Sequence, residues 1–114
     1  MITLASQTNI FLYCQATDMR KGFDGLSGIV RDELKQEPTD GSLFLFINRR
    51  ADRIKILYWD RDGLALWYKR LEAGTFERTT DGEKPVVKID STELSMLLGG
   101  VPLAKTKRRK RFVA

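Results

Sequence analysis

Residues 53–72, RIKILYWDRDGLALWYKRLE, constrain the fold more than any other part of the chain, because they hold two strand-length runs around one short turn. Each run alternates apolar side chains with other types, which is typical of a half-buried β-strand. Between them, Asp60 to Gly63 (DRDG) suits a type I turn followed by a glycine in the left-handed conformation, which makes a three-residue hairpin loop. The stretch therefore predicts an antiparallel β-hairpin.

The length of this loop determines which side chains share a face of the hairpin. A three-residue loop places position 60 opposite position 64. One face then collects a mostly aliphatic set, typical of a core: Ile54, Ile56, Tyr58, Leu64, Leu66 and Tyr68. The other face collects a mixed set: Arg53, Lys55, Leu57, Trp59, Ala65, Trp67, Lys69 and Leu71. A two-residue loop would shift the register by one and mix the two sets.

The mixed set places both tryptophans beside three cations, and two interpretations are open. A helix or a second sheet can cover the tryptophans while the Lys and Arg stems extend outward. Alternatively the face is open to solvent, so that the rings stack on bases while the cations hold a sugar-phosphate backbone. The second interpretation gives these nucleic-acid-binding candidates on the hairpin: Arg53, Lys55, Trp59, Trp67 and Lys69.

The rest of the chain predicts a single α+β domain with a mostly antiparallel sheet. Apolar runs predict three further strands, at 9–14, 42–48 and 85–90. The expected order of elements is strand, helix, three-stranded meander, strand and short helix.

Two helices are predicted from apolar spacing and end signals. The first covers about residues 20–36, with Thr17 or Asp18 as its cap and Pro38 as its stop. The second is short, with Asp90 or Ser91 as its cap and Gly99 as its terminator.

Three glycines recur every three positions in the first predicted helix: Gly22, Gly25 and Gly28. Each should cost about 0.5–1 kcal/mol relative to alanine. Close packing of the helix backbone on the sheet would offset that loss. The alternative is that the start of the helix, with Arg20 and Lys21 beside it, approaches a phosphate.

The end of the chain carries its positive excess. Six of the 20 Lys and Arg residues fall there, leaving 14 basic and 15 acidic residues elsewhere. These six are Lys105, Lys107, Arg108, Arg109, Lys110 and Arg111. We therefore divide the chain into a globular domain at 1–104 and a basic, flexible tail at 105–114. The tail either keeps the protein soluble or contacts a phosphate backbone, because clustered cations release condensed counterions.

Several kinds of chemistry are excluded or disfavoured. The chain has no histidine and one cysteine, Cys14. Ser-His and Cys-His pairs, an intramolecular disulfide and a Cys-based zinc site within one chain are therefore excluded. The carboxylates fall mostly in turns, so we expect no enzyme, no metal and no cofactor; a metal-dependent nuclease is the remaining catalytic alternative. We expect a cytoplasmic protein without membrane association, because no apolar run approaches about 20 residues and the start lacks a secretion signal.

Two motifs resemble those of the TnpB accessory proteins from the IS66 family of insertion sequences: DMRKGFDGL at 18–26 and DRIKILYWDRDGLALWYKRLEAGTF at 52–76. These proteins are unrelated to the RNA-guided nuclease also called TnpB. The resemblance covers about residues 9–76. It implies a role in DNA transposition without transposase chemistry, which the family leaves to a separate protein.

Two functions are therefore predicted. In the first, the protein is a nucleic-acid-binding accessory factor that holds DNA, such as insertion-sequence ends, through the hairpin face, Arg20, Lys21 and the basic tail. In the alternative, it is an adaptor whose aromatic residues contact the transposase or a second copy of the chain, without direct DNA binding. The oligomeric state is left open.

Overall fold

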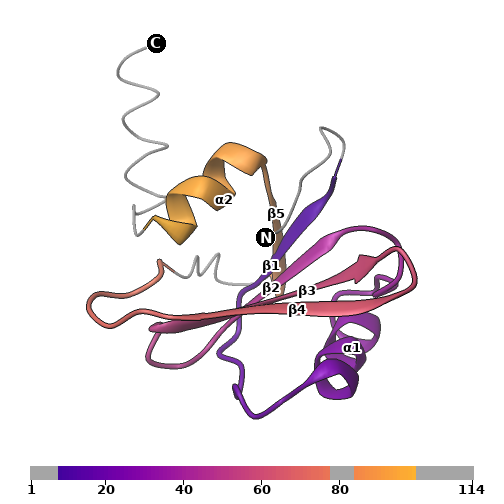
Figure 1. Ribbon diagram of the computed structural model, residues 1–114, viewed down its shortest axis with the longest axis horizontal. Coiled ribbons are helices and arrows are strands. Elements are labelled where there is room, and N and C mark those ends of the chain that lie inside the picture. The colour runs from indigo at the N-terminus through magenta and orange to yellow at the C-terminus, as the bar shows by residue number, and fades with distance from the viewer. Residues whose placement is uncertain (1–7, 78–83, 100–114) are drawn as a thin grey trace.

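The computed structural model describes residues 8–77 and 84–99, and its elements follow the predicted order (Figure 1). They are β1 (Ile10–Tyr13), α1 (Phe23–Asp32), β2 (Leu43–Ile47), β3 (Arg53–Asp60), β4 (Gly63–Arg70), β5 (Val86–Ile89) and α2 (Ser91–Leu98). The five strands form one sheet in the order β4-β3-β2-β1-β5. The predicted α+β class with a mostly antiparallel sheet is confirmed. The basic tail, and with it the boundary at residue 104, lies outside the described residues.

The sheet has one parallel pair, β1 with β2, and α1 connects the two strands. A helical crossover of this kind returns the chain to the same end of the sheet, so that the next strand runs in the same direction. The other pairs are antiparallel: β2–β3, β3–β4 and β1–β5.

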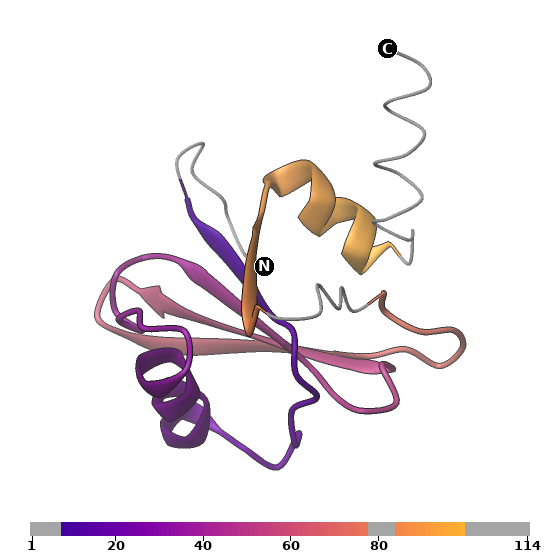
Figure 2. The same ribbon diagram turned by 180° about the vertical axis from the view of Figure 1, so that it is seen from behind.

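The two helices cover opposite faces of the sheet, as the two views in Figures 1 and 2 show. On the α2 face, Leu94 and Leu97 pack in a cluster with aliphatic side chains of β1, β2, β3 and β5, including Leu12, Leu45 and Ile56, and Trp67 of β4 packs against this cluster. On the α1 face, Leu26 and Val30 pack with a second cluster. The further members of this second cluster are Tyr13, Leu34, Phe44, Phe46 and Leu57. The sheet therefore has apolar residues on both sides.

The predicted second helix is confirmed in detail. The Glu93 backbone N–H donates to the Asp90 carboxylate at 2.7 Å, and the Asp90 N–H donates to the Glu93 carboxylate at 3.1 Å. This reciprocal pair is a capping box, which satisfies backbone donors that the first turn of a helix leaves unpaired. Gly99 ends the helix, as expected.

The start of the first helix differs from the prediction. The helix begins at Phe23 after Gly22, which provides no side-chain cap, so the prediction of a cap at Thr17 or Asp18 is wrong. The Asp18 carboxylate instead accepts the backbone N–H of Arg20 at 2.9 Å. Such a local bond stabilises a turn of its own, and this turn delays the helix by several residues.

The helix glycines do not pack closely on the sheet. A Cβ atom would meet nothing within 4 Å at Gly22 and Gly28, and at Gly25 it would meet only the Lys21 side chain, at 3.2 Å. The expectation of close backbone packing is therefore wrong.

The hairpin loop has two residues, Arg61 and Asp62, because Asp60 lies opposite Gly63. Arg61 takes the left-handed conformation, with φ of 59°, that was predicted for the glycine. A positive φ at the first position of a two-residue loop suits the twist of the flanking strands. The three-residue loop, and the register built on it, are therefore wrong.

The shifted register changes the partners of every β3 side chain. Ile54, Ile56 and Tyr58 lie opposite Lys69, Trp67 and Ala65. Arg53, Lys55, Leu57 and Trp59 lie opposite Arg70, Tyr68, Leu66 and Leu64. Directly opposed residues share a face, so Trp59 lies on the α1 side of the sheet and Trp67 on the α2 side. The predicted face with both tryptophans does not exist, because the two-residue loop moves every β4 side chain to the opposite side of the sheet relative to β3.

Candidate nucleic-acid interface

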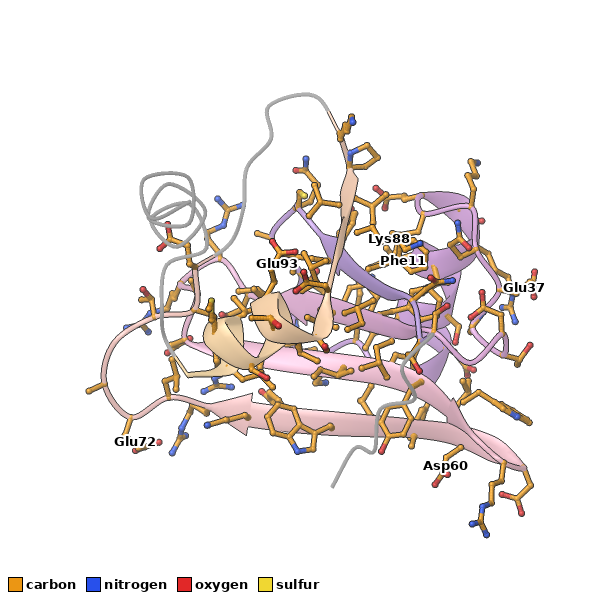
Figure 3. The ribbon with its side chains drawn as sticks, turned by 90° about the horizontal axis from the view of Figure 1, so that it is seen from above. Phe11, Glu37, Asp60, Glu72, Lys88 and Glu93 are labelled. Atoms are coloured by element: carbon orange, nitrogen blue, oxygen red, sulfur yellow. The ribbon has the colours of Figure 1, made fainter. Side chains whose placement is uncertain are left out.

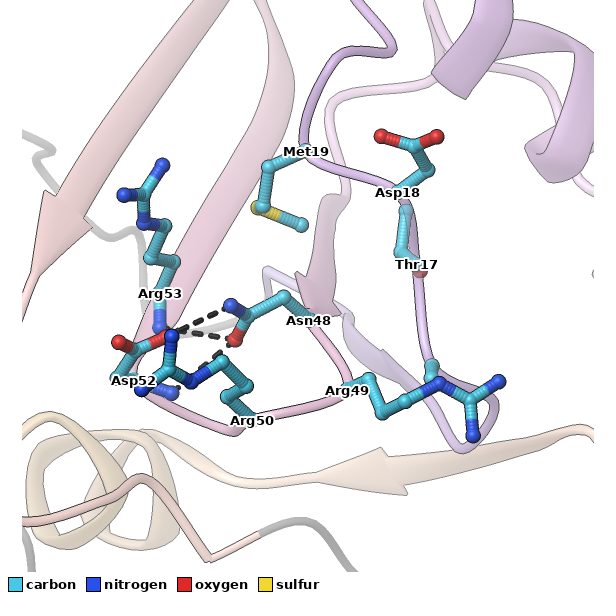
Figure 4. Close-up of a pocket in the computed structure, with 9 residues that line it drawn as sticks. Thr17, Asp18, Met19, Asn48, Arg49, Arg50, Asp52 and Arg53 are labelled. Atoms are coloured by element: carbon cyan, nitrogen blue, oxygen red, sulfur yellow. Dashed lines mark hydrogen bonds between the residues drawn. The ribbon is translucent and has the colours of Figure 1, made fainter.

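A groove of about 490 Å³ lies between the segment after β1 and the β2–β3 turn (Figure 4). We call it the arginine groove. Its lining comprises Ala16, Thr17, Asp18, Met19, Asn48, Arg49, Arg50, Asp52 and Arg53. Three guanidinium groups thus border one hollow on the surface.

The Asn48 side chain holds the β2–β3 turn in shape. Its carbonyl oxygen accepts the backbone N–H groups of Asp52 and Arg53 at 3.1 and 3.0 Å, while its amide donates to the Asp52 carboxylate at 2.7 Å (Figure 4). Arg49 and Arg50 follow Asn48 directly and are exposed. The fixed turn therefore presents both arginines to solvent.

The acids of the groove leave its arginines unpaired. The Asn48 amide, more than any other group, lowers the pKa of Asp52, and the charges of Arg50 and Arg53 lower it further. Within 8–77 and 84–99, the ion pairs involve Arg20, Arg31 and Arg70, and none involves the guanidinium groups of the arginine groove. An anion of another molecule would therefore find these three groups available.

Residues 18–21 before α1, which we call the motif loop, carry two more cations next to the groove residues Asp18 and Met19. Arg20 donates hydrogen bonds to the Asp18 carboxylate from Nε at 3.0 Å and from Nη2 at 2.6 Å, although its side chain is 92% exposed. This hydrogen bonding lowers the pKa of Asp18 to about 2. Lys21 is exposed next to it. Arg20 is thus largely neutralised by Asp18, and Lys21 adds a positive charge.

Lys55 is directed inward. It is only 7% exposed, and its Nζ donates to the backbone carbonyls of Met19 at 2.7 Å and Lys21 at 2.8 Å. The same Nζ lies 4.8 Å from the ring centroid of Tyr68. Lys55 therefore fastens the motif loop to β3, and we leave it out of the contact surface.

A second hollow of about 380 Å³ adjoins the arginine groove through Arg53. Its lining comprises Arg53, Tyr68, Arg70 and Glu72. Arg53 Nη1 donates to the Tyr68 hydroxyl at 3.2 Å, and Arg70 Nε donates to Glu72 at 3.0 Å. We call this second hollow the tyrosine hollow.

The predicted candidates are only partly brought together. Arg53 lines both hollows, whereas Arg20 and Lys21 directly follow the groove residues Asp18 and Met19 in the chain. Trp59 is half-buried six residues further along β3, which places it about 20 Å from Arg53 at the usual rise of a strand. Trp67 packs on the α2-side core, and Lys69 is exposed on that same side. The tail candidates, residues 105–111, lie outside the described residues.

Sequence reasoning missed four residues of this surface: Arg49, Arg50, Tyr68 and Arg70. Arg49 and Arg50 could have been found, because two adjacent arginines lie between two predicted strands. Tyr68 and Arg70 could be placed on this face only with the correct register, which depends on the length of the β3–β4 loop.

The described residues contain no group of three or more His, Cys, Asp or Glu side chains that could hold a metal ion. No helix in the described part of the chain combines the length and the apolar character that crossing a membrane requires.

Comparison with known proteins identifies the family. Residues 8–108 match the family described as IS66 Orf2 like protein. The chain belongs to this family. It is similar to uncharacterized protein y4jC of Sinorhizobium fredii (strain NBRC 101917 / NGR234), with 32% identity over 96% of this chain and 92% of the relative. It is also similar to uncharacterized protein y4hO of the same strain, with 34% identity over 89% of this chain and 87% of the relative. No solved structure matches.

The IS66 Orf2-like family indicates an insertion-sequence accessory protein, and it is not a known catalytic family. The resemblance stated from the sequence is thereby confirmed. In this IS66 Orf2-like chain, the two motifs meet in space: the first supplies the loop at Asp18–Lys21, and the second supplies Arg53, Lys55 and Tyr68. These residues of the two motifs therefore build one surface on the α1 side of the sheet.

Proposed function

We propose that this IS66 Orf2-like protein is a non-catalytic accessory factor of DNA transposition that binds the DNA backbone through the arginine groove. The observation that carries the proposal is the set of three guanidinium groups around one hollow, Arg49, Arg50 and Arg53, none of which is in an ion pair within the described residues. Arginine suits phosphate because its planar fork donates two parallel hydrogen bonds.

The fixed turn favours binding. Asn48 holds the backbone of Asp52 and Arg53, so the loop needs little ordering when a phosphate arrives. Lower ordering losses leave more of the interaction energy for affinity. Contacts of this kind position DNA and do not distinguish base sequence.

Further contacts complete the proposed interface. Lys21 and Arg20 extend it along the motif loop, and the tail cations at 105–111 add a second, sequence-independent attachment. Lys69 lies near the same end of β4 but on the other side of the sheet. The proposed partners are DNA at the insertion-sequence ends and the transposase of the same element, and we place the protein in the cytoplasm.

The test is a binding titration of the full chain with duplex DNA at several salt concentrations. Removing two phosphate contacts with Arg49→Gln and Arg50→Gln together should reduce the slope of log affinity against log salt by about 2, and deletion of 105–114 should reduce it by up to about 5. The matched control carries Arg31→Gln and Lys88→Gln, which remove two exposed charges elsewhere. Lys88 lies on β5, the sheet edge opposite the hairpin (Figure 3).

The control should keep the wild-type slope within about 0.5, since neither charge borders the groove. Equal loss in the control and the groove variant would contradict the proposal, because it would show a general charge effect. Element-end DNA and unrelated DNA should be compared in the same assay. A preference for element ends would require contacts beyond those proposed here.

One observation favours the adaptor as a second function. Phe23 is 47% exposed at the start of α1, and a Cβ atom at the preceding Gly22 would meet nothing within 4 Å. An exposed aromatic ring on an accessible helix suits a protein interface. If the adaptor is correct, Phe23→Ala should abolish retention of the transposase in a pull-down while DNA binding persists. Trp59→Ala and Trp67→Ala test the two sides of the sheet separately in the same assay.

A further inference from the structure

The Tyr68 ring is held in place and yet remains available. It is 47% exposed on the edge strand β4, where it lies opposite Lys55 of β3. Because Lys55 is nearly fully buried, its ammonium, 4.8 Å from the ring centroid, lies on the inner side of the ring. The outward part of the ring is left to solvent.

Two cations fix the orientation of this ring. Lys55 attracts the inner face through the negative quadrupole of the aromatic system. Arg53 holds the hydroxyl from the edge, with Nη1 donating at 3.2 Å. A ring already fixed in this way loses little side-chain freedom when a flat ligand stacks on it.

The surroundings of the ring suit the phosphates of a nucleotide chain. Arg53 and Arg70 flank Tyr68 in the tyrosine hollow. Arg70 is paired with Glu72, so its charge is available in part only. Arg53 also borders the arginine groove, which makes a continuous path from the proposed backbone contacts to the ring.

From this arrangement we propose that Tyr68 is a stacking platform for an unpaired nucleobase, and that the protein therefore binds single-stranded DNA at the tyrosine hollow. The inference rests on the proposed function and names the form of DNA that the surface takes. Bases within a duplex are stacked on each other and offer no free face, whereas an unpaired base can lie on the ring. The platform accepts any base, because every base has a flat face.

The test compares three DNAs of equal length with the full chain: a single strand of thymidines, a strand of abasic units with the same phosphates, and a mixed-sequence duplex. Tyr68→Ala should weaken binding of the thymidine strand about 5- to 140-fold, which corresponds to the loss of about 1–3 kcal/mol for one stacked base. The same substitution should change binding of the abasic strand and the duplex less than about twofold. Tyr68→Phe keeps the ring and should retain most of the thymidine-strand affinity.

A matched variant tests the charge beside the ring. Glu72→Gln frees Arg70 and should strengthen single-strand binding severalfold, while it leaves the ring in place. A strand carrying 2-aminopurine gives an independent signal: its fluorescence should fall on binding to wild-type protein and to Tyr68→Phe, and stay high with Tyr68→Ala. Thermal unfolding of each variant shows whether the fold is kept.

The inference is overturned if Tyr68→Ala weakens the thymidine and abasic strands equally, or if Tyr68→Phe behaves as Tyr68→Ala does in a folded protein. Backbone binding would then stand without a base platform. The inference is also overturned if Tyr68→Ala no longer retains the transposase in a pull-down while its affinities for all three DNAs are unchanged. That result would assign the ring to a protein partner. If no DNA binds in a salt-dependent way, the proposed function itself fails.

Discussion

The two faces of the sheet are closed in different ways. The α2 face is a continuous aliphatic core under a helix that a capping box starts and a glycine ends. The α1 face has a buried ammonium, a helix without a side-chain cap, and the contact between the two family motifs. The α2 face is regular in its caps and packing, whereas the irregular α1 face carries the residues that we propose contact DNA. Sites of function are where local rules of structure are most often broken.

The largest effect on stability should come from leucine-to-alanine substitutions in each of the two apolar clusters. Leu97 on α2 and Leu26 on α1 are both fully buried. Replacing either with alanine should lower the free energy of unfolding by about 3 kcal/mol, through lost burial and the cavity left behind, as measured by urea denaturation. At a temperature where both variants are folded, DNA affinity should fall only in Leu26→Ala, because α1 supports the motif loop. Equal affinity losses would break the division between the two faces.

A smaller effect is expected at Lys55. Lys55→Met keeps most of the unbranched side chain but removes the ammonium that donates to the carbonyls of Met19 and Lys21. Losing hydrogen bonds from a charged group should lower the free energy of unfolding by about 2–3 kcal/mol. Amide exchange in the motif loop should rise at the same time.

Lys69→Met is the control for this substitution. Lys69 is exposed on the neighbouring strand, so the same change should alter stability by less than about 0.5 kcal/mol. If Lys55→Met were equally harmless, the bridge between the two motifs would be unimportant.

The smallest effect concerns the Asp18–Arg20 pair at the rim of the surface. The pKa of Asp18 in the folded protein is about 2, below the usual value of 3.8, mainly because Arg20 bonds the carboxylate. A lowered folded-state pKa contributes stability above the unfolded pKa, and this contribution is lost as pH falls from about 4 to about 2. The difference in denaturation midpoint between wild type and Asp18→Asn should therefore narrow over that interval.

A double-mutant cycle checks this interpretation. In an Arg20→Gln background, the difference in denaturation midpoint caused by Asp18→Asn should change little between about pH 4 and about pH 2, because the principal bonding partner of Asp18 is gone. An unchanged narrowing would assign the effect to some other group near Asp18.

The elements could be predicted from the sequence because each follows from local rules. Asp90 and Gly99 mark the ends of α2 through bonds within a few residues, and the strands follow from runs of apolar side chains. The register could not be predicted, because it depends on Arg61 adopting a backbone conformation with positive φ, which residues other than glycine rarely take.

The site was predictable only in its charges. Arg20 and Lys21 were named from their place beside the predicted helix start, and Arg53 from the predicted hairpin face. The inward direction of Lys55, by contrast, depends on carbonyl groups 34 and 36 residues away in the chain. The arginine groove likewise forms only when the segment after β1 meets the β2–β3 turn. Contacts of this kind arise from tertiary packing, which no short window of sequence contains.

The position of β4 at the end of the sheet has a consequence for solubility. An outer strand of eight residues that carries Trp67 and Tyr68 is the kind of edge that templates aggregation, since its outward backbone groups can pair with another chain. Lys69 and Arg70 close this strand with two adjacent positive charges. Mutual repulsion between such charges discourages copies from pairing edge to edge, so cations beside the proposed DNA-binding surface also act as gatekeepers against aggregation of the free protein.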